Sequence, residues 1–258
     1  MTKLAGDNTE SLEREIDALK KKLAESEQQK ADLLKVVSHD IKSPFNKIFA
    51  LCNLLKLTSD NLDEEQEEYI STMEMVIKEG LSLVRNLLDI RAIDYKGIEM
   101  LHADIDIKEE LAQSKKAFMK AAERKGITLN MRHLEDVTSW TDKQYLGRIF
   151  DQLLSNAIKY GPKESNVDID LHKSETTYKV SIMDSGVGLT EEEIPDLYKR
   201  FTPLLAQPTG GENSIGLGLF IAQTLAKKMG GEVSFEPLNT GSKFMVTMPI
   251  KESQKEES

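Results

Sequence analysis

The feature that most constrains this chain is a heptad pattern that begins at Leu12. The positions on one helical seam recur in steps that alternate strictly between four and three residues: Leu12, Ile16, Leu19, Leu23, Ser26, Lys30, Leu33 and Val37. Glycine and proline are absent from this stretch, and charged residues fill most positions between. The pattern therefore predicts a helix that pairs with another in a coiled coil over residues 1–35. A single solvated amphipathic helix is the alternative, since Ser26 and Lys30 weaken the seam.

The helical pattern continues past Pro44 and stops near residues 58–61, a Thr-Ser-Asp-Asn group suited to turns and caps. A second helix is expected from about Asp63, with the same heptad spacing through Arg91. Two long helices joined by a short loop form a hairpin, here over residues 30–93. Because one hairpin has little to bury its faces against, two are expected to pair as a four-helix dimer.

After residue 93 the pattern changes to mixed helices and strands. Residues 94–100 are expected to be a linker and residues 101–250 a compact α/β domain, with a charged tail at 251–258. Expected helices cover about 107–125, 142–160 and 217–229, and expected strands cover 127–131, 167–171, 178–182, 232–235 and 242–249. The fold class predicted for the whole chain is α+β.

Composition excludes some functions. The chain has 34 Lys plus Arg against 44 Asp plus Glu, a net charge of −10, which disfavours a nucleic-acid binder. No run approaches the roughly 20 apolar residues of a membrane helix, and residues 1–10 lack the apolar core of a signal peptide. The one cysteine, Cys52, has apolar neighbours and is expected to be a buried packing residue. We therefore expect a cytoplasmic protein without a membrane segment in this chain.

His39 lies in the first expected helix and is followed by Asp40, whose carboxylate can hold one imidazole tautomer. Ser43 lies four residues later, on the same helical face. Pro44 cannot donate the helical hydrogen bond to the carbonyl of Asp40, so it loosens the helix there. A nucleophilic histidine beside such a bend could accept a transferred group, although an ordinary surface histidine is the simpler alternative.

A second group of polar residues lies on the helix expected at 142–160. Gln152, Asn156 and Lys159 share one face, and Tyr160 follows. Two amides and a lysine can hold an oxygen-bound cation and a phosphate chain. The alternative is a solvated polar face.

Two glycine-bearing segments follow. Asp184, Gly186 and Gly188 come directly after an expected strand, where glycines let a ligand approach the backbone and a carboxylate could accept a hydrogen bond from a purine amino group. Gly216, Leu217 and Gly218 open the last expected helix, whose N-terminal amides favour phosphate. Residues 202–214, rich in glycine and proline, are expected to form a mobile lid.

Each motif is weak alone, but their order resembles the catalytic core of bacterial sensor histidine kinases over about residues 30–250. His39 and its flanks resemble the H-box, residues 152–160 the N-box, 184–188 the G1 box, 197–201 the F-box and 216–219 the G2 box. Gly241 and Ser242 resemble the minor third glycine motif.

The resemblance implies a dimerisation and histidine-phosphotransfer hairpin, followed by an α/β-sandwich domain of the histidine kinase and Hsp90-like type that binds ATP and Mg²⁺. It implies that Asn156, with Gln152, binds Mg²⁺, and that Asp184 binds the adenine amino group. Lys159, Tyr160 and Arg200 would contact the phosphates or ribose. His39 would take the γ-phosphoryl group, with Asp40 as base or orienting group, and pass it to an aspartate on the receiver domain of a response regulator.

Two positions depart from the family pattern. Gln152 stands where asparagine is more common. Ser43 stands where the family usually has threonine or asparagine, the residue linked to dephosphorylation of the regulator, and its hydroxyl could still orient a water. Two other functions remain open from the residues: an ATPase module without histidine transfer, and a coiled-coil signalling scaffold.

Overall fold

The computed structural model describes residues 2–59, 61–95, 100–202, 206–210 and 216–252. Within these ranges the side chains of residues 2–15, 24, 27–38 and 91–95 are not described. The chain divides into two compact units, one ending at residue 97 and the other beginning at residue 98.

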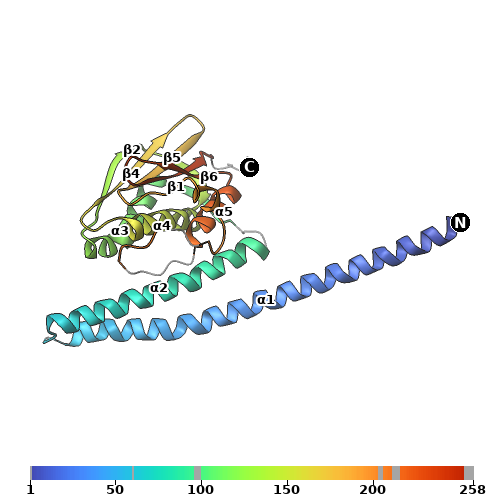
Figure 1. Ribbon diagram of the computed structural model, residues 1–258, viewed down its shortest axis with the longest axis horizontal. Coiled ribbons are helices and arrows are strands. Elements are labelled where there is room, and N and C mark those ends of the chain that lie inside the picture. Colours follow the sequence, from blue (N-terminus) through green and yellow to red (C-terminus); the bar gives the residue numbers. More distant parts are fainter. Residues whose placement is uncertain (1, 60, 96–99, 203–205, 211–215, 253–258) are drawn as a thin grey trace, which may run out of the picture. The chain divides into compact units, whose positions relative to one another are not determined.

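The first unit is a helical hairpin made of α1 (Thr2–Thr58) and α2 (Glu64–Tyr95) (Figure 1). Helix α1 continues through Pro44 and ends at Thr58, at the predicted turn. The start of α2 is capped reciprocally, because the Gln66 amide donates to Oδ1 of Asp63 at 2.8 Å and the Asp63 amide donates to Oε1 of Gln66 at 3.2 Å. This capping box satisfies backbone donors that the first turn of a helix leaves unpaired.

A small apolar core holds the two helices together. Cys52, Ile70 and Ile77 are buried, with Phe45, Phe49, Leu62 and Leu81 packed against them. The expected packing role of Cys52 is confirmed, since its side chain is 2% exposed. Beside this core, Nζ of Lys56 lies 2.9 Å from a carboxylate oxygen of Glu74; this ion pair joins α1 to α2, with the Glu74 side chain buried and that of Lys56 partly exposed.

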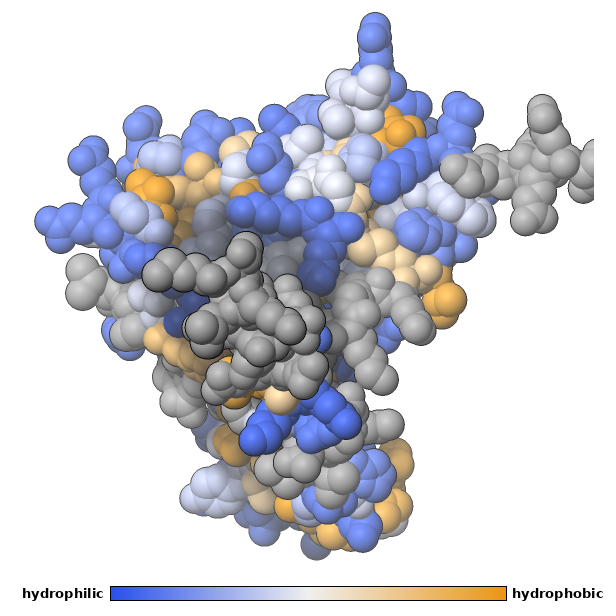
Figure 2. Space-filling view, turned by 90° about the vertical axis from the view of Figure 1, so that its right-hand side faces the viewer, coloured by the Kyte–Doolittle hydropathy of each residue, from blue (hydrophilic) through white to orange (hydrophobic). Residues whose placement is uncertain are grey.

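One hairpin leaves many apolar side chains uncovered. Those exposed in the single chain are Ile41, Ile48, Leu51, Leu54, Leu55, Leu57, Tyr69, Met73 and Val76. Figure 2 shows hydrophobic residues, in orange, among the hydrophilic ones at the surface. Of the predicted heptad seam, Ile16, Leu19 and Leu23 are exposed, whereas Leu12, Lys30, Leu33 and Val37 lie outside the described side chains.

The second unit is a two-layer α/β sandwich built on a mixed five-stranded sheet of order β2-β4-β5-β7-β6. The strands are β2 (Thr128–Leu134), β4 (Asn166–Lys173), β5 (Thr177–Asp184), β6 (Glu232–Pro237) and β7 (Ser242–Pro249). Only β2 and β4 pair in parallel. Alternate residues of β7 are buried, as expected for a sheet with one face against a core.

Three helices cover one face of this sheet: α3 (Ile107–Arg124), α4 (Lys143–Tyr160) and α5 (Gly218–Lys228) (Figure 1). Asp106 and Asp142 cap α3 and α4 by accepting hydrogen bonds from amides three residues later. The apolar sides of α4 and α5 meet the sheet in a core that includes Phe150, Leu153, Ile182, Ile221 and Val246. The structure therefore has the α+β class that the sequence predicts.

Two short strands were not expected from the sequence. β1 (His102–Asp106) pairs antiparallel with β3 (Thr138–Asp142). β1 carries no buried residue, so it lacks the apolar alternation that marks a half-buried strand. Its partner lies over 30 residues away along the chain, and such a pairing leaves no local signal. In the described part of the chain, no helix is both long enough and apolar enough to cross a membrane.

Candidate nucleotide-binding site and phosphoacceptor histidine

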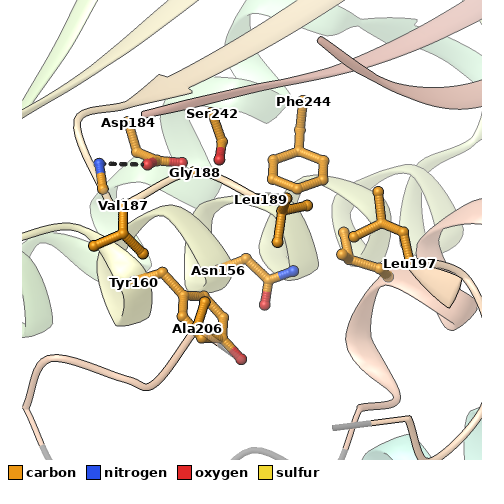
Figure 3. Close-up of a pocket in the computed structure, with 12 residues that line it drawn as sticks. Asn156, Tyr160, Asp184, Val187, Gly188, Leu189, Leu197, Ala206, Ser242 and Phe244 are labelled. Carbon is orange, nitrogen blue, oxygen red and sulfur yellow. Dashed lines mark hydrogen bonds between the residues drawn. The ribbon is translucent and has the colours of Figure 1, made fainter. Parts of the chain in front are cut away.

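A cavity of about 410 Å³ opens in the second unit beside α4 and the loop that follows β5 (Figure 3). This volume includes space that is open to solvent. The cavity is lined by Asn156, Tyr160, Asp184, Gly186, Val187, Gly188, Leu189, Leu197, Ala206, Leu219, Ser242 and Phe244. Most of its wall is apolar, with a few polar groups placed among the apolar ones.

Helix α4 supplies Asn156 and Tyr160, which lie one turn apart and both line the cavity. Their neighbours Leu153, Leu154 and Ala157 are buried on the opposite side. The sequence predicts a polar face of Gln152, Asn156 and Lys159; of these three residues Asn156 lines the cavity, whereas Gln152 and Lys159 do not. Figure 3 shows the Asn156 amide and the Tyr160 ring rising from the same helix into the cavity.

Asp184 ends β5 and is 5% exposed. Its Oδ1 accepts a hydrogen bond from the Gly186 amide at 2.8 Å, drawn as a dashed line in Figure 3. Burial raises the pKa of Asp184 to about 6, although hydrogen bonds from the amides of Gly186 and Ser242 act in the opposite direction. At neutral pH the side chain is therefore mostly an ionised acceptor in an apolar cavity.

Gln152 lies one turn before Asn156 but is buried and does not line the cavity. Its amide packs against the first residue of α5: a β-carbon on Gly218 would lie 2.6 Å from Oε1 of Gln152 and 3.7 Å from Oδ1 of Asn156. The two side-chain amides of α4 thus converge on the N-terminus of α5, where a β-carbon at position 218 would force the Gln152 amide to shift. The N-terminal amides of a helix favour an anion at this point.

Other residues that the sequence predicts to contact the ligand do not line the cavity. Gly216 and Leu217 precede α5 without lining the cavity, and Leu217 is buried. Lys159 is half-buried and also outside the lining set. The guanidinium carbon of Arg200 stacks 4.3 Å from the centre of the Phe220 ring on α5. Lys159 and Arg200 are thus near the cavity in sequence and structure, but the lining does not include them.

Several lining residues were not singled out from the sequence. Phe244, on β7, is one of them. Ser242, which the sequence points to through its likeness to the minor third glycine motif, also lines the cavity, and the β5–β7 register places it opposite Asp184. Ala206 lies in the stretch 202–214 that the sequence predicts to be a lid, of which residues 203–205 and 211–214 lie outside the described part of the chain.

His39 lies in the first unit, on α1. Its side chain is 83% exposed, and Nδ1 is 3.3 Å from Oδ1 of Asp40. This contact favours the tautomer with the proton on Nδ1, which leaves the Nε2 lone pair available. Ser43 is half-buried one turn later.

A metal site fits this chain only together with a ligand. Among the described residues no group of three or more His, Cys, Asp or Glu side chains could hold a metal ion. Mg²⁺ usually keeps several waters and is bound by few protein oxygens plus substrate phosphates. The amide oxygen of Asn156 beside the N-terminus of α5 meets that requirement.

Both units match known families. Residues 29–96 match the family model described as the His Kinase A (phospho-acceptor) domain. Residues 141–252 match the model described as the histidine kinase-, DNA gyrase B- and HSP90-like ATPase. The chain therefore contains the catalytic core of a sensor histidine kinase and belongs to the protein-histidine kinases.

Known sensor proteins and a solved structure are similar to this chain over most of its length. The autoinducer 2 sensor kinase/phosphatase LuxQ of Vibrio parahaemolyticus is 25% identical over 252 residues, which cover 94% of this chain and 29% of LuxQ. The sensor protein EvgS of Escherichia coli is 30% identical over 257 residues, 95% of this chain and 21% of EvgS. The chain thus spans less than a third of these two relatives. A crystal structure of full-length ShkA in complex with AMPPNP matches with a TM-score of 0.64 at 26% identity, covering 86% of this chain and 46% of ShkA.

Proposed function

We propose that the cavity binds ATP with Mg²⁺, that His39 takes the γ-phosphoryl group, and that the group then passes to an aspartate on the receiver domain of a response regulator. The observation that carries the proposal is the buried carboxyl group of Asp184 in the wall of a mostly apolar cavity. A mostly apolar cavity with a buried acceptor suits a flat heteroaromatic ring that carries an exocyclic amino group, and adenine is such a ring.

The polar groups around the cavity suit the remainder of the nucleotide. Asn156 and the first residues of α5 lie together. The α5 amides would receive the phosphates, and Asn156 would supply an oxygen to Mg²⁺. The bound ion would neutralise charge on the phosphate chain. Tyr160, one turn further along α4, would contact the ribose or phosphates.

The chemistry at His39 follows from its contact with Asp40. The Nε2 lone pair attacks the γ-phosphorus, the bond to the bridging oxygen breaks, and its electron pair leaves on ADP. The ring then carries a positive charge, and Asp40 lies where it can accept the Nδ1 proton. Positioning and charge neutralisation supply most of the catalysis in such a loose transition state.

Ser43 shares the face of His39 and retains a hydroxyl. We propose that this hydroxyl orients a water for hydrolysis of the phosphorylated regulator.

The exposed apolar side chains of the hairpin support dimerisation. Leu51, Leu54 and Leu55 are each about half exposed in the single chain. Leaving such a contiguous set in water is unfavourable, and a second hairpin would cover it in a four-helix bundle.

Incubation with γ-labelled ATP and Mg²⁺ tests the proposal. The wild-type chain should gain label that is stable to base and labile to acid, as expected of a phosphoramidate. His39→Gln should gain none while binding a non-hydrolysable ATP analogue as tightly as the wild type. Steady phosphate release that persists in His39→Gln would favour a simple ATPase instead, and absence of nucleotide binding would favour a scaffold.

A further inference from the structure

A buried lysine that belongs to none of the family motifs joins the end of α4 to the segment 206–210. Lys125 follows α3 and is 8% exposed. Its ammonium group donates to the carbonyls of Ile158 at 2.8 Å and Lys159 at 3.0 Å, and to Oγ1 of Thr209 at 2.8 Å.

This arrangement suits the end of a helix. The last carbonyls of an α-helix have no partner within the helix, and a cation there also interacts favourably with the helix dipole. An ammonium group has three protons to donate, which suits contacts with two carbonyls and a hydroxyl. Lys125 therefore ties the C-terminal turn of α4 to Thr209.

Thr209 completes the network from its own side. Its amide donates to the Lys159 carbonyl at 2.9 Å. Its hydroxyl has one proton and lies 2.6 Å from the Gly161 carbonyl, closer than the 3.2 Å to that of Lys159. The hydroxyl thus donates to Gly161 while it accepts from Lys125.

The network connects two walls of the cavity. Tyr160, at the end of α4, and Ala206, three residues before Thr209, both line it. We propose that Lys125 and Thr209 act as positioning residues that hold the Ala206 wall against the α4 wall, and so set the affinity of the cavity for nucleotide. This inference rests on the proposed nucleotide-binding function.

Two substitutions of Thr209 distinguish the effect of its hydroxyl group from the effect of its side-chain shape. Thr209→Val keeps the shape and removes both hydroxyl hydrogen bonds, whereas Thr209→Ser keeps the hydroxyl. Thr209 is exposed, so neither change should alter the folding of the domain. Calorimetry with AMPPNP and Mg²⁺ should show binding about tenfold weaker in Thr209→Val, as expected for two lost hydrogen bonds. Thr209→Ser should bind within about twofold of the wild type.

A second measurement does not depend on nucleotide. In the free protein, the Thr209 amide should exchange with solvent deuterium several-fold faster in Thr209→Val than in Thr209→Ser or the wild type. Equal exchange in all three would overturn the inference, as would unchanged affinity in Thr209→Val or equal weakening in both variants. Failure of the wild type to bind AMPPNP would instead reject the proposed function, and the exchange result would still decide whether the network orders this segment.

Discussion

The backbones of Gly241 and Asp184 touch: a β-carbon on Gly241 would lie 1.8 Å from the carbonyl oxygen of Asp184. Gly241 also has a φ of +94°, which L side chains rarely adopt. The residue before β7 therefore fixes the end of β5, where the candidate adenine-binding carboxylate lies. Gly241 does not itself line the cavity, but its contact with Asp184 connects it to the site.

Gly241→Ala should therefore displace Asp184 and lower the free energy of unfolding of the second unit by at least about 2 kcal/mol, from overpacking and backbone strain together. Gly230→Ala is the matched control. Gly230 also has a positive φ, +88°, but its nearest neighbour would be 3.7 Å from the new β-carbon. It should cost only about 1 kcal/mol. Denaturant unfolding followed by the fluorescence of Trp140, the only tryptophan, measures both. Equal losses would show that the contact with Asp184 is unimportant.

The raised pKa of Asp184 predicts a pH-dependent stability. The folded state binds the proton more tightly than the unfolded state, whose pKa is near the ordinary value of 3.8, because folding raises the pKa to about 6. This group therefore contributes stability at low pH that is lost as pH rises from about 4 to 6. The asparagine side chain in Asp184→Asn does not titrate. The free energy of unfolding of this variant, relative to that of the wild type, should therefore rise by about 2–3 kcal/mol between pH 4 and pH 7.

Denaturant titrations of the nucleotide-free proteins at several pH values check this prediction. The difference between the two proteins removes the effect of all other titrating groups. A difference that stays constant with pH, or shrinks as pH rises, would contradict the assigned pKa. At pH 7 Asp184→Asn should also lose most of its affinity for AMPPNP.

Asn156→Ala should remove the response of nucleotide binding to magnesium. In the wild type, replacing Mg²⁺ with a chelator should weaken AMPPNP binding, because Asn156 and the phosphates share the ion. In Asn156→Ala, replacing Mg²⁺ with a chelator should have little effect on AMPPNP binding. The coupling between the substitution and the removal of Mg²⁺ is then as large as the magnesium effect in the wild type. Titration calorimetry in each condition gives the four affinities. An undiminished magnesium effect in the variant would move the metal site away from Asn156.

Lys56→Met should destabilise the hairpin by about 1–2 kcal/mol, because it removes the ammonium group 2.9 Å from the carboxylate of Glu74, whose side chain is 8% exposed. The effect is smaller than for a fully buried pair because Lys56 is 37% exposed. Lys20→Met is the control, since Lys20 and Asp17 form a solvent-exposed pair at 4.0 Å. Thermal unfolding followed by circular dichroism at 222 nm should respond to the first change and not to the second.

Local patterns predicted much of this fold. Helical periodicity with a cap and a stop predicted the hairpin turn near Asp63, and the polar face expected on α4 included Asn156, which lines the cavity. Strands with buried alternation, such as β5 and β7, were also expected. By contrast, β1 has no buried residue, and the buried residues of β3 are polar: Ser139, Thr141 and Asp142. The two strands also pair across a long stretch of chain, so neither could be recognised locally.

The site was predictable where a residue type has its own chemistry, as with Asp184 in a glycine-bearing loop. It was not predictable where tertiary packing decides. Gln152, expected on the polar face of α4, is buried beside Gly218 and does not line the cavity. Phe244 and Ala206 enter the cavity only because β7 and the segment 206–210 are brought there by contacts distant in sequence.

The central claim is that His39 receives the phosphoryl group, and peptide mapping tests it most directly. Cleavage after Lys35 and Lys42 releases residues 36–42, which contain Ser38 and His39 as neighbours. After incubation with ATP and Mg²⁺ and digestion at alkaline pH, fragmentation of this peptide by electron transfer should place one phosphate on His39. A phosphate on Ser38, or an unmodified peptide while another part of the chain is phosphorylated, would contradict the claim.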